Sequence, residues 1–135
     1  MVFADSSGYV AVFDPRDAGH AAANAAWQEV AKARLKMVTT ALVVAETATL
    51  VRRRVGWEAS RKVGDAILRS RGIDVVGIDG EGLSAAWREF LRNPDRKLSL
   101  CDAYSFVVMR ERGIRRAFTF DRHFADAGFD PLPWG

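Results

Sequence analysis

The sequence predicts an α/β protein: a three-layer α/β/α sandwich around a short, mainly parallel central sheet. Two observations lead to this fold class. Short apolar, β-compatible runs alternate along the chain with longer segments whose apolar residues recur at helical spacing. No repeat, low-complexity tract or linker interrupts this alternation. Because strands separated by helices are joined by crossovers, we expect a parallel sheet covered by helices.

The predicted strands are short and rich in apolar or β-branched residues. They are Val2 to Ala4, Lys36 to Thr39, Ile73 to Ile78 and Ala117 to Phe120. The third is the clearest, because it directly follows the turn residue Gly72. Near the C-terminus, Pro131-Leu132-Pro133 is expected to form a short edge segment.

The segments between these strands are predicted to be helices. They are Ser7 to Phe13, Ala18 to Arg34, Thr40 to Arg54, Trp57 to Arg71, Glu81 to Leu91 and Ser99 to Arg112. Asp17 is the predicted N-cap of the second helix, and Gly56 and Gly113 stand where two others end. Asn93-Pro94-Asp95-Arg96 is a turn by composition, and 121–128 is expected to be a loop or a short helix.

Length and composition indicate one globular domain over residues 1–135, with 49% hydrophobic and 27% charged residues. The single cysteine, Cys101, excludes an intrachain disulfide and fits a reducing compartment. No signal peptide is evident, and no apolar stretch approaches the roughly 18 residues of a membrane span. We therefore expect a cytoplasmic protein without a membrane partner.

The charge balance is mildly basic, with a formal net charge of +3. Arginines gather at Arg52-Arg53-Arg54 and again at Arg110, Arg112, Arg115 and Arg116. Such groups usually form a solvated face, but beside an acidic pocket they would suit a phosphodiester backbone.

Four acidic residues lie at the start or flank of predicted elements: Asp5, Glu46, Asp102 and Asp121. Asp5 and Asp121 follow predicted strands, and the carboxyl ends of parallel strands share one edge of the sheet. Asp102 in the first turn of its helix and Glu46 on another helix can face the same crevice. Converging carboxylates repel each other unless a cation or protons intervene, and oxygen ligands favour Mg²⁺ or Mn²⁺ over zinc.

Each acid also has a simpler structural explanation. Asp5 and Asp121 could cap the segments that follow them, and Ser99-x-x-Asp102 matches a capping box. Glu46 is the hardest to explain in this way. At helical spacing it lies between Val43 and Leu50, at the border of the apolar stripe, where a carboxylate needs a partner.

Taken together, these motifs resemble the PIN domain, and specifically the toxin of a VapBC-type toxin–antitoxin pair. The resemblance covers essentially the whole chain. It rests on segments that each contain one or more polar residues at fixed spacing: Asp5-Ser6-Ser7, Asp17-x-x-His20-x-x-Ala23, Val43-Val44-Ala45-Glu46-Thr47, Ser99-x-x-Asp102-Ala103 and Thr119-Phe120-Asp121-Arg122-His123-Phe124, followed by Ala127-Gly128-Phe129.

The resemblance implies that Asp5, Glu46, Asp102 and Asp121 bind divalent metal, supported by Ser6 and Thr119. It implies an endoribonuclease that cleaves RNA with water activated by one or two Mg²⁺ or Mn²⁺ ions. It also implies a homodimer, and an antitoxin protein whose tail covers the crevice. Some family members carry a further acid or amide just after the position of Asp121, where this chain has Arg122 and His123 and, farther on, Asp126.

For the remaining polar and aromatic residues, roles outside catalysis and metal binding are favoured. A structural or RNA-contacting role is favoured over metal binding or base catalysis for His20 and His123, and Cys101 is expected in the core. The four tryptophans are expected in core or subunit packing rather than base stacking: Trp27, Trp57, Trp87 and Trp134.

Three other functions compete with the nuclease. A haloacid-dehalogenase-type phosphatase would need a second acid at the place of Ser7. A receiver-type signalling domain would need paired acids after the first strand and a phosphoacceptor aspartate in mid-chain. A non-catalytic or weakly catalytic RNA-binding or assembly module of the same fold is the more serious rival, and the presence of all four acids speaks against it.

Overall fold

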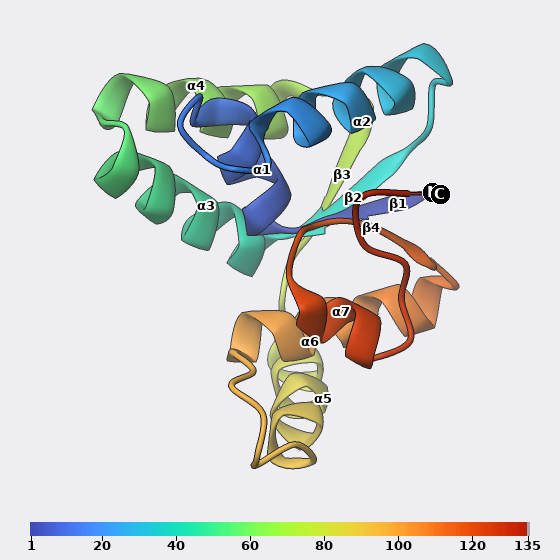
Figure 1. Ribbon diagram of the computed structural model, residues 1–135. Coiled ribbons are helices and arrows are strands. Elements are labelled where there is room, and N and C mark those ends of the chain that lie inside the picture. The colour runs from blue at the N-terminus through green and yellow to red at the C-terminus, as the bar shows by residue number, and fades with distance from the viewer. Residues whose placement is uncertain (135) are drawn as a thin grey trace.

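The computed structural model describes residues 1–134, and a four-stranded, fully parallel sheet lies at its centre (Figure 1). The strands are β1 (Val2–Ala4), β2 (Met37–Thr40), β3 (Ile73–Val76) and β4 (Arg116–Phe118), in the order β3-β2-β1-β4. In β1, Val2 is paired with Met37 on one side and Arg116 on the other. The first strand of the chain is therefore central and buried.

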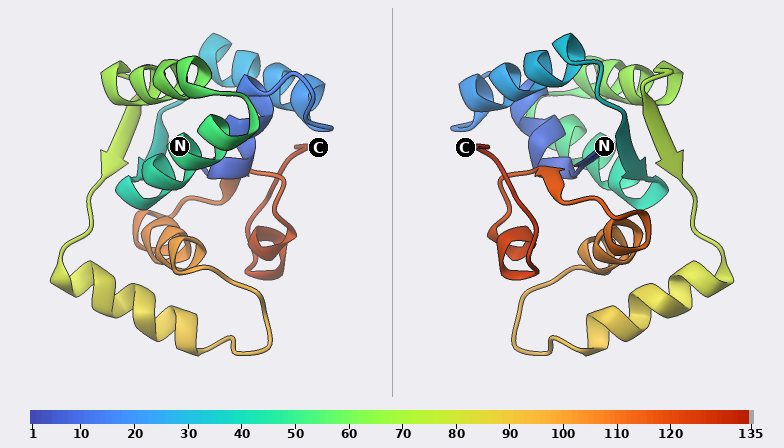
Figure 2. Two further views of the ribbon diagram at one scale, coloured as in Figure 1. Left: turned by 90° about the vertical axis from the view of Figure 1, so that its left-hand side faces the viewer. Right: turned by 90° about the vertical axis from the view of Figure 1, so that its right-hand side faces the viewer.

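Helices cover both faces of this sheet. One face carries α1 (Ser6–Phe13), α2 (His20–Lys32), α3 (Ala41–Arg54) and α4 (Trp57–Arg69). The other face carries α5 (Gly80–Leu91), α6 (Leu100–Arg112) and α7 (Arg122–Asp126), and α5 lies outermost, packed on α6 (Figure 2). The predicted three-layer sandwich with a parallel sheet is confirmed.

The path of the chain explains why a site forms where it does. The chain moves from β1 to β2 to β3 in one direction and then returns to place β4 on the free side of β1. Crossovers between parallel strands are almost always right-handed, so this reversal puts the later helices on the opposite face. Ligands bind beyond the carboxyl ends of strands at such a reversal, here between β1 and β4.

Tight packing presses the start of α1 against the end of β4. Gly8 allows this approach, because a Cβ atom there would lie only 2.3 Å from the Phe118 carbonyl oxygen. Tyr9 and Phe118 are both fully buried and meet edge-on, with ring centroids 6.2 Å apart. The residues just before Gly8 are thus held beside the residues just after Phe118.

Several element boundaries differ from the prediction. The second helix begins at His20 with Gly19 as its N-cap, so the predicted capping by Asp17 is wrong. Asp17 instead accepts a hydrogen bond from the Gly19 N–H at 2.8 Å, which stabilises the turn before the helix. The last strand ends at Phe118. A single bridge pairs Arg116 with Asp130, just before the predicted edge segment 131–133, which forms no strand of its own.

Two of the tryptophans are not in the core. Trp57 and Trp87 are 58% and 50% exposed, so of the predicted core or subunit packing only subunit packing remains a prediction for them. Trp27 does pack inside, against Tyr9 and Phe118. Within residues 1–134, none of the helices is both long enough and apolar enough to cross a membrane.

Candidate active site

Asp5 follows β1 and is only 2% exposed. Its Oδ2 accepts a hydrogen bond of 2.8 Å from the Thr119 hydroxyl, which comes from the end of β4. Its Oδ1 is buried and has no hydrogen-bond partner among the described residues. A buried carboxylate oxygen without a partner is costly, and this one is available to a cation.

A small hydroxyl network ties the two strand ends together. The Ser7 hydroxyl lies 2.8 Å from that of Thr119 and accepts a hydrogen bond of 2.9 Å from the Phe120 N–H. The Asp121 N–H donates to the Thr119 hydroxyl at 3.1 Å. Thr119 was predicted to support the site. Ser7 was not, although the neighbouring hydroxyls in Asp5-Ser6-Ser7 were a usable signal.

Glu46 reaches the site from α3, and Ser6 determines its position. The Ser6 hydroxyl donates a hydrogen bond to Glu46 Oε1. Ser6 is buried and Glu46 is half-buried, where α1 packs against α3. The carboxylate at the border of the apolar stripe thus has the hydrogen-bonding partner that the sequence required.

Asp102 opens α6, and the predicted capping box is confirmed. The Ser99 N–H donates to Asp102 Oδ2 at 3.2 Å, and the Asp102 N–H donates to the Ser99 hydroxyl at 2.9 Å. Asp102 is only 7% exposed. The cap occupies one carboxylate oxygen and leaves Oδ1 outside the capping box, so capping does not exclude a second role.

Asp121 caps α7 and brings His123 into the site. Its Oδ1 accepts a hydrogen bond of 2.9 Å from the His123 N–H. The His123 Nδ1 atom lies 3.0 Å from the same oxygen, but at an angle that makes no hydrogen bond. Asp102, Asp121 and His123 offer ligand atoms that all lie within 4.8 Å of one another. The sequence favoured a structural or RNA-contacting role for His123, and the structure places its ring nitrogen close to the carboxylates of Asp102 and Asp121.

The charges of all four acids act on one another. Burial, together with the charges of Asp102 and Glu46, raises the pKa of Asp5 from 3.8 to about 7. Burial also raises the pKa of Asp102, with added repulsion from Asp121 and Glu46. Among the ion pairs that the described residues form, none involves Asp5, Glu46 or Asp102.

This arrangement fits a hard divalent cation. The donors are carboxylate oxygens with one imidazole nearby, and one buried oxygen of Asp5 lacks any partner. Mg²⁺ and Mn²⁺ prefer such oxygen-rich sites, and a cation would offset both the burial of these charges and the repulsion between them, the two causes that raise the pKa values of Asp5 and Asp102. Cys101 is buried beside the acids, and burial together with their charges raises the pKa of its thiol, so it is not a ready ligand.

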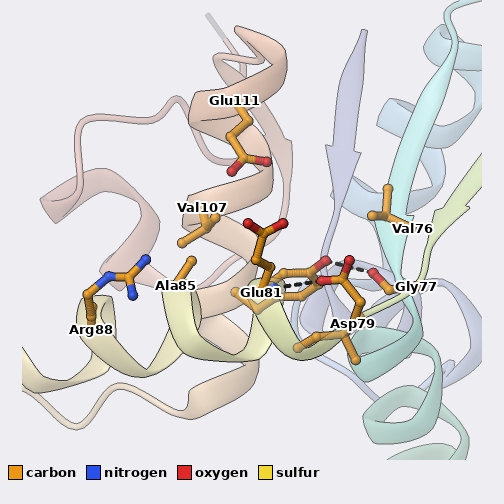
Figure 3. A pocket seen from close by; sticks show the side chains of 11 residues that line it. Val76, Gly77, Asp79, Glu81, Ala85, Arg88, Val107 and Glu111 are labelled. Atoms are coloured by element: carbon orange, nitrogen blue, oxygen red, sulfur yellow. Dashed lines mark hydrogen bonds between the residues drawn. The ribbon is translucent and has the colours of Figure 1, made fainter.

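Two surface hollows differ in their relation to these acids. A hollow of about 230 Å³ adjoins them and is lined in part by Ser6 and Ser7. A larger one of about 730 Å³ lies away from them, between the β3–α5 connection, α5 and α6 (Figure 3). None of the four acids lines either hollow, but the smaller one is lined by the serines that connect to Glu46 and Asp5, whereas the exposed carboxylates of the larger one belong to Asp79, Glu81 and Glu111. The volume of a hollow therefore does not by itself identify the acidic site.

Three arginines of the group Arg110, Arg112, Arg115 and Arg116 make contacts with other side chains of the protein. Arg110 pairs with Glu89 at 2.8 Å, and Arg112 pairs with Asp74 at 2.6 Å. The Arg116 guanidinium lies over the Trp134 ring, 5.2 Å from its centroid. From the first group, Arg54 borders the smaller hollow. Of these two arginine groups, Arg54 at the end of α3 is the member that lines the hollow beside Ser6 and Ser7.

His20 has a structural position, as predicted. Its Nδ1 donates to the Ala11 carbonyl oxygen at 2.7 Å, and Asn24 donates to its Nε2 at 3.1 Å. These bonds hold the start of α2 against α1.

Comparisons with known proteins define the class to which this fold and site belong. The family model of the PIN domain matches residues 2–130, and the chain belongs to the PIN-domain family. It is similar to the 23S rRNA-specific endonuclease VapC20 of Mycobacterium tuberculosis, from both strain CDC 1551 / Oshkosh and strain ATCC 25618 / H37Rv. The identity is 36% over 129 residues, covering 96% of this chain and 95% of the relative.

A solved structure agrees with this similarity. The crystal structure of Mycobacterium tuberculosis VapC20, a sarcin–ricin loop cleaving toxin, superposes with a TM-score of 0.87 at 33% identity and covers 96% of each chain. The resemblance to PIN-domain toxins with endoribonuclease activity, first drawn from the motifs, is confirmed.

Proposed function

We propose that this chain is a divalent-metal-dependent endoribonuclease and the toxin of a type II toxin–antitoxin pair. The observation that carries the proposal is the convergence of Asp5, Glu46, Asp102 and Asp121 from four elements of a PIN fold. Full-length similarity to an RNA-cleaving toxin supports it.

Some residues would bind the metal ion, and others would orient the side chains that bind it. Asp5, Asp102 and Asp121, with help from Glu46, would hold Mg²⁺ or Mn²⁺. When bound, the ion lowers the pKa of a water molecule and offsets charge on the scissile phosphate. The Thr119 hydroxyl orients Asp5, and the Ser6 hydroxyl orients Glu46. These hydrogen bonds restrict the ligands to one geometry before RNA arrives.

We infer that the substrate is a structured RNA with an unpaired loop, and that ribosomal RNA is the first one to test. The relative's name specifies 23S rRNA, and the solved structure's title specifies the sarcin–ricin loop. The partners would be a cognate antitoxin and a second copy of the chain. Action on ribosomes also places the protein in the cytoplasm.

The test is metal-dependent cleavage of a hairpin RNA carrying the sarcin–ricin loop sequence. The native protein should cleave it with Mg²⁺ or Mn²⁺ and not with EDTA. Asp5→Asn, Asp102→Asn and Asp121→Asn should each lower the rate by roughly 100-fold or more, because an amide removes the charge that the cation needs. Glu46→Gln should be impaired less if Glu46 acts from outside the ligand set.

The matched control is Asp95→Asn, the same change at an exposed turn residue, which should keep full activity. Full activity in two of the three site variants would dismantle the proposed site. Metal-independent RNA binding without cleavage would instead favour a non-catalytic RNA-binding module.

A further inference from the structure

The smaller hollow adjoins the acidic site on the side of α1 and α3. It has a volume of about 230 Å³ and is lined by apolar and polar side chains: Ser6, Ser7, Val10, Asp17, Leu50, Arg54 and Phe120. Ser6 is bonded to Glu46, and Ser7 contacts the Thr119 hydroxyl that binds Asp5. A group that fills this hollow therefore lies next to the two serine hydroxyls that connect to Glu46 and, through Thr119, to Asp5.

Phe120 is the aromatic wall of the hollow, and its ring is held in place. It is half-buried, and its N–H donates to the Ser7 hydroxyl at 2.9 Å. The backbone of Gly19 packs against the ring, since a Cβ atom at Gly19 would lie 2.8 Å from the ring carbons Cε2 and Cζ. A ring supported in this way is a preorganised surface, and Phe120 stands directly before the proposed ligand Asp121.

The rim of the hollow is polar. Arg54 lies 3.5 Å from the Asp17 carboxylate, farther than a direct hydrogen bond, and its side chain is half exposed. Arg16 donates to the Arg54 carbonyl oxygen, which ties the end of α3 to the α1–α2 connection. The lining thus combines a guanidinium from Arg54 and a carboxylate from Asp17 with apolar side chains such as Val10 and Leu50.

We propose that this hollow takes one unpaired nucleobase of the RNA, next to the scissile phosphate, with the base stacked on Phe120 and its edge facing Arg54 and Asp17. The inference rests on the proposed ribonuclease function. Single-stranded RNA is recognised by stacking on aromatic side chains combined with hydrogen bonds to base edges. The volume corresponds to roughly eight water molecules, which is the scale of one base rather than a dinucleotide.

The position of Phe120 specifies which nucleotide is read. Phe120 and Asp121 are consecutive in the chain, so a base on that ring belongs to a nucleotide adjoining the phosphate held at the acids. Stacking holds the bound substrate and the transition state alike, so its loss should change KM rather than kcat.

The experiment combines a protein change with an RNA change. Cleavage of the hairpin RNA with Mn²⁺ is measured for native protein, Phe120→Ala and Phe120→Tyr, on substrates with a single abasic nucleotide at each position flanking the cut. Phe120→Ala should raise KM about tenfold with little change in kcat, and Phe120→Tyr should retain the native KM. At one flanking position, the abasic nucleotide should raise KM about tenfold for native protein and less than about twofold for Phe120→Ala, because the two changes remove the same contact.

Controls separate stacking from damage to the fold. Trp57→Ala removes an exposed aromatic that does not line the hollow and should leave KM unchanged. If a melting curve shows that Phe120→Ala is unstable, Arg54→Gln takes its place. This change alters the exposed rim of the same hollow and leaves the core intact. If the effects of the abasic nucleotide and of Phe120→Ala or Arg54→Gln multiply at every position, the inference is overturned.

Failure of the proposed function gives a different result. A native protein that cleaves no RNA refutes the ribonuclease, and the same abasic series is then read by binding, using fluorescence anisotropy of a labelled hairpin. Loss of affinity at one position that depends on Phe120 would still support the hollow as a base site. Equal binding across the series would overturn it.

Discussion

At the scale of single residues, burial and neighbouring charge act on Asp5 in the same direction. Its pKa of about 7 means that, without metal, the carboxyl group is largely protonated below neutral pH. A cation that binds there must displace this proton, so metal affinity should rise as pH increases through that range. Proton and metal thus compete for the same oxygen atoms.

The raised pKa of Asp5 predicts a pH-dependent loss of stability in the metal-free protein. In the unfolded chain the group titrates near 3.8 and in the folded protein near 7, so the folded state binds more protons between these values. The contribution of Asp5 to stability is fully present below 3.8 and is lost as pH rises through about 7. Asp5→Asn cannot titrate and should lack this decline.

Thermal unfolding with EDTA from about pH 4 to pH 8 measures the effect. The melting temperature of native protein, taken relative to that of Asp5→Asn, should fall as pH increases. Asp95→Asn, with the same change at an exposed turn residue, should follow the native curve. Parallel curves for native protein and Asp5→Asn would show that Asp5 has an ordinary environment.

The candidate site was predictable residue by residue only in part. The order of the acids and the strand ends predicted that Asp5 and Asp121 would lie on one edge, and the structure brings the four acids together there. Their role as metal ligands remains a prediction. The closeness of His123 to the acids was not predicted, because a cap motif indicates where a backbone N–H points and not where the following side chain lies.

At the scale of elements, the first turn of α6 combines two functions in Asp102. Its Oδ2 closes the capping box, while its charge belongs to the acidic site. Substitutions can separate the two, because an asparagine oxygen can still accept from the Ser99 N–H and an alanine cannot.

Melting curves of native protein, Asp102→Asn and Asp102→Ala with EDTA and with Mn²⁺ should show this separation. With EDTA, Asp102→Asn should melt no lower than native protein, because it removes a buried charge and keeps the cap. Asp102→Ala should lose about 1 kcal/mol with the cap. Both should show a smaller rise with Mn²⁺ than native protein, whose gain approaches roughly 2.7 kcal/mol at a hundred times the dissociation constant. A native melting temperature unmoved by Mn²⁺ would contradict the metal site.

Element identity followed well from the sequence, and element boundaries less well. Helical spacing and glycine ends predicted every major helix, since those signals are local. The predicted start of α2 was wrong because the sequence shows only that an aspartate is present. Which backbone N–H its carboxylate accepts from depends on the turn around it. Asp17 bonds the Gly19 N–H, and the helix begins only afterwards.

At the scale of the whole molecule, α5 stands apart from the rest. It packs chiefly on α6, and it exposes apolar side chains one turn apart: Leu83, Trp87 and Leu91. A hollow of about 520 Å³ beside them is lined mainly by Leu83, Trp87, Arg88 and Leu100. Exposed apolar surface of this kind commonly marks a protein interface, and it is the face at which the homodimer proposed above would form. The sequence predicted the parallel sheet but could not show that this helix face would be left uncovered.

A charge placed on this face should separate the proposed dimer. Native protein is expected to be a dimer by light scattering coupled to size-exclusion chromatography, and Trp87→Glu a monomer, because a buried unpaired carboxylate opposes association. Trp57→Glu introduces the same charge at an exposed tryptophan of α4 and should leave the dimer intact. A monomeric native protein, or equal effects of both variants, would refute this interface.

The pairing of β4 with β1 has a consequence for when the protein becomes able to act. Asp5 directly follows the first strand made during synthesis, and Thr119 and Asp121 follow the last, so the strands must pair before these residues meet. A growing chain that has not yet released β4 therefore has Asp5, Glu46 and Asp102 but lacks Thr119 and Asp121. For an enzyme proposed to cleave ribosomal RNA, this order of assembly protects the ribosome that is making it until the end of the domain has emerged.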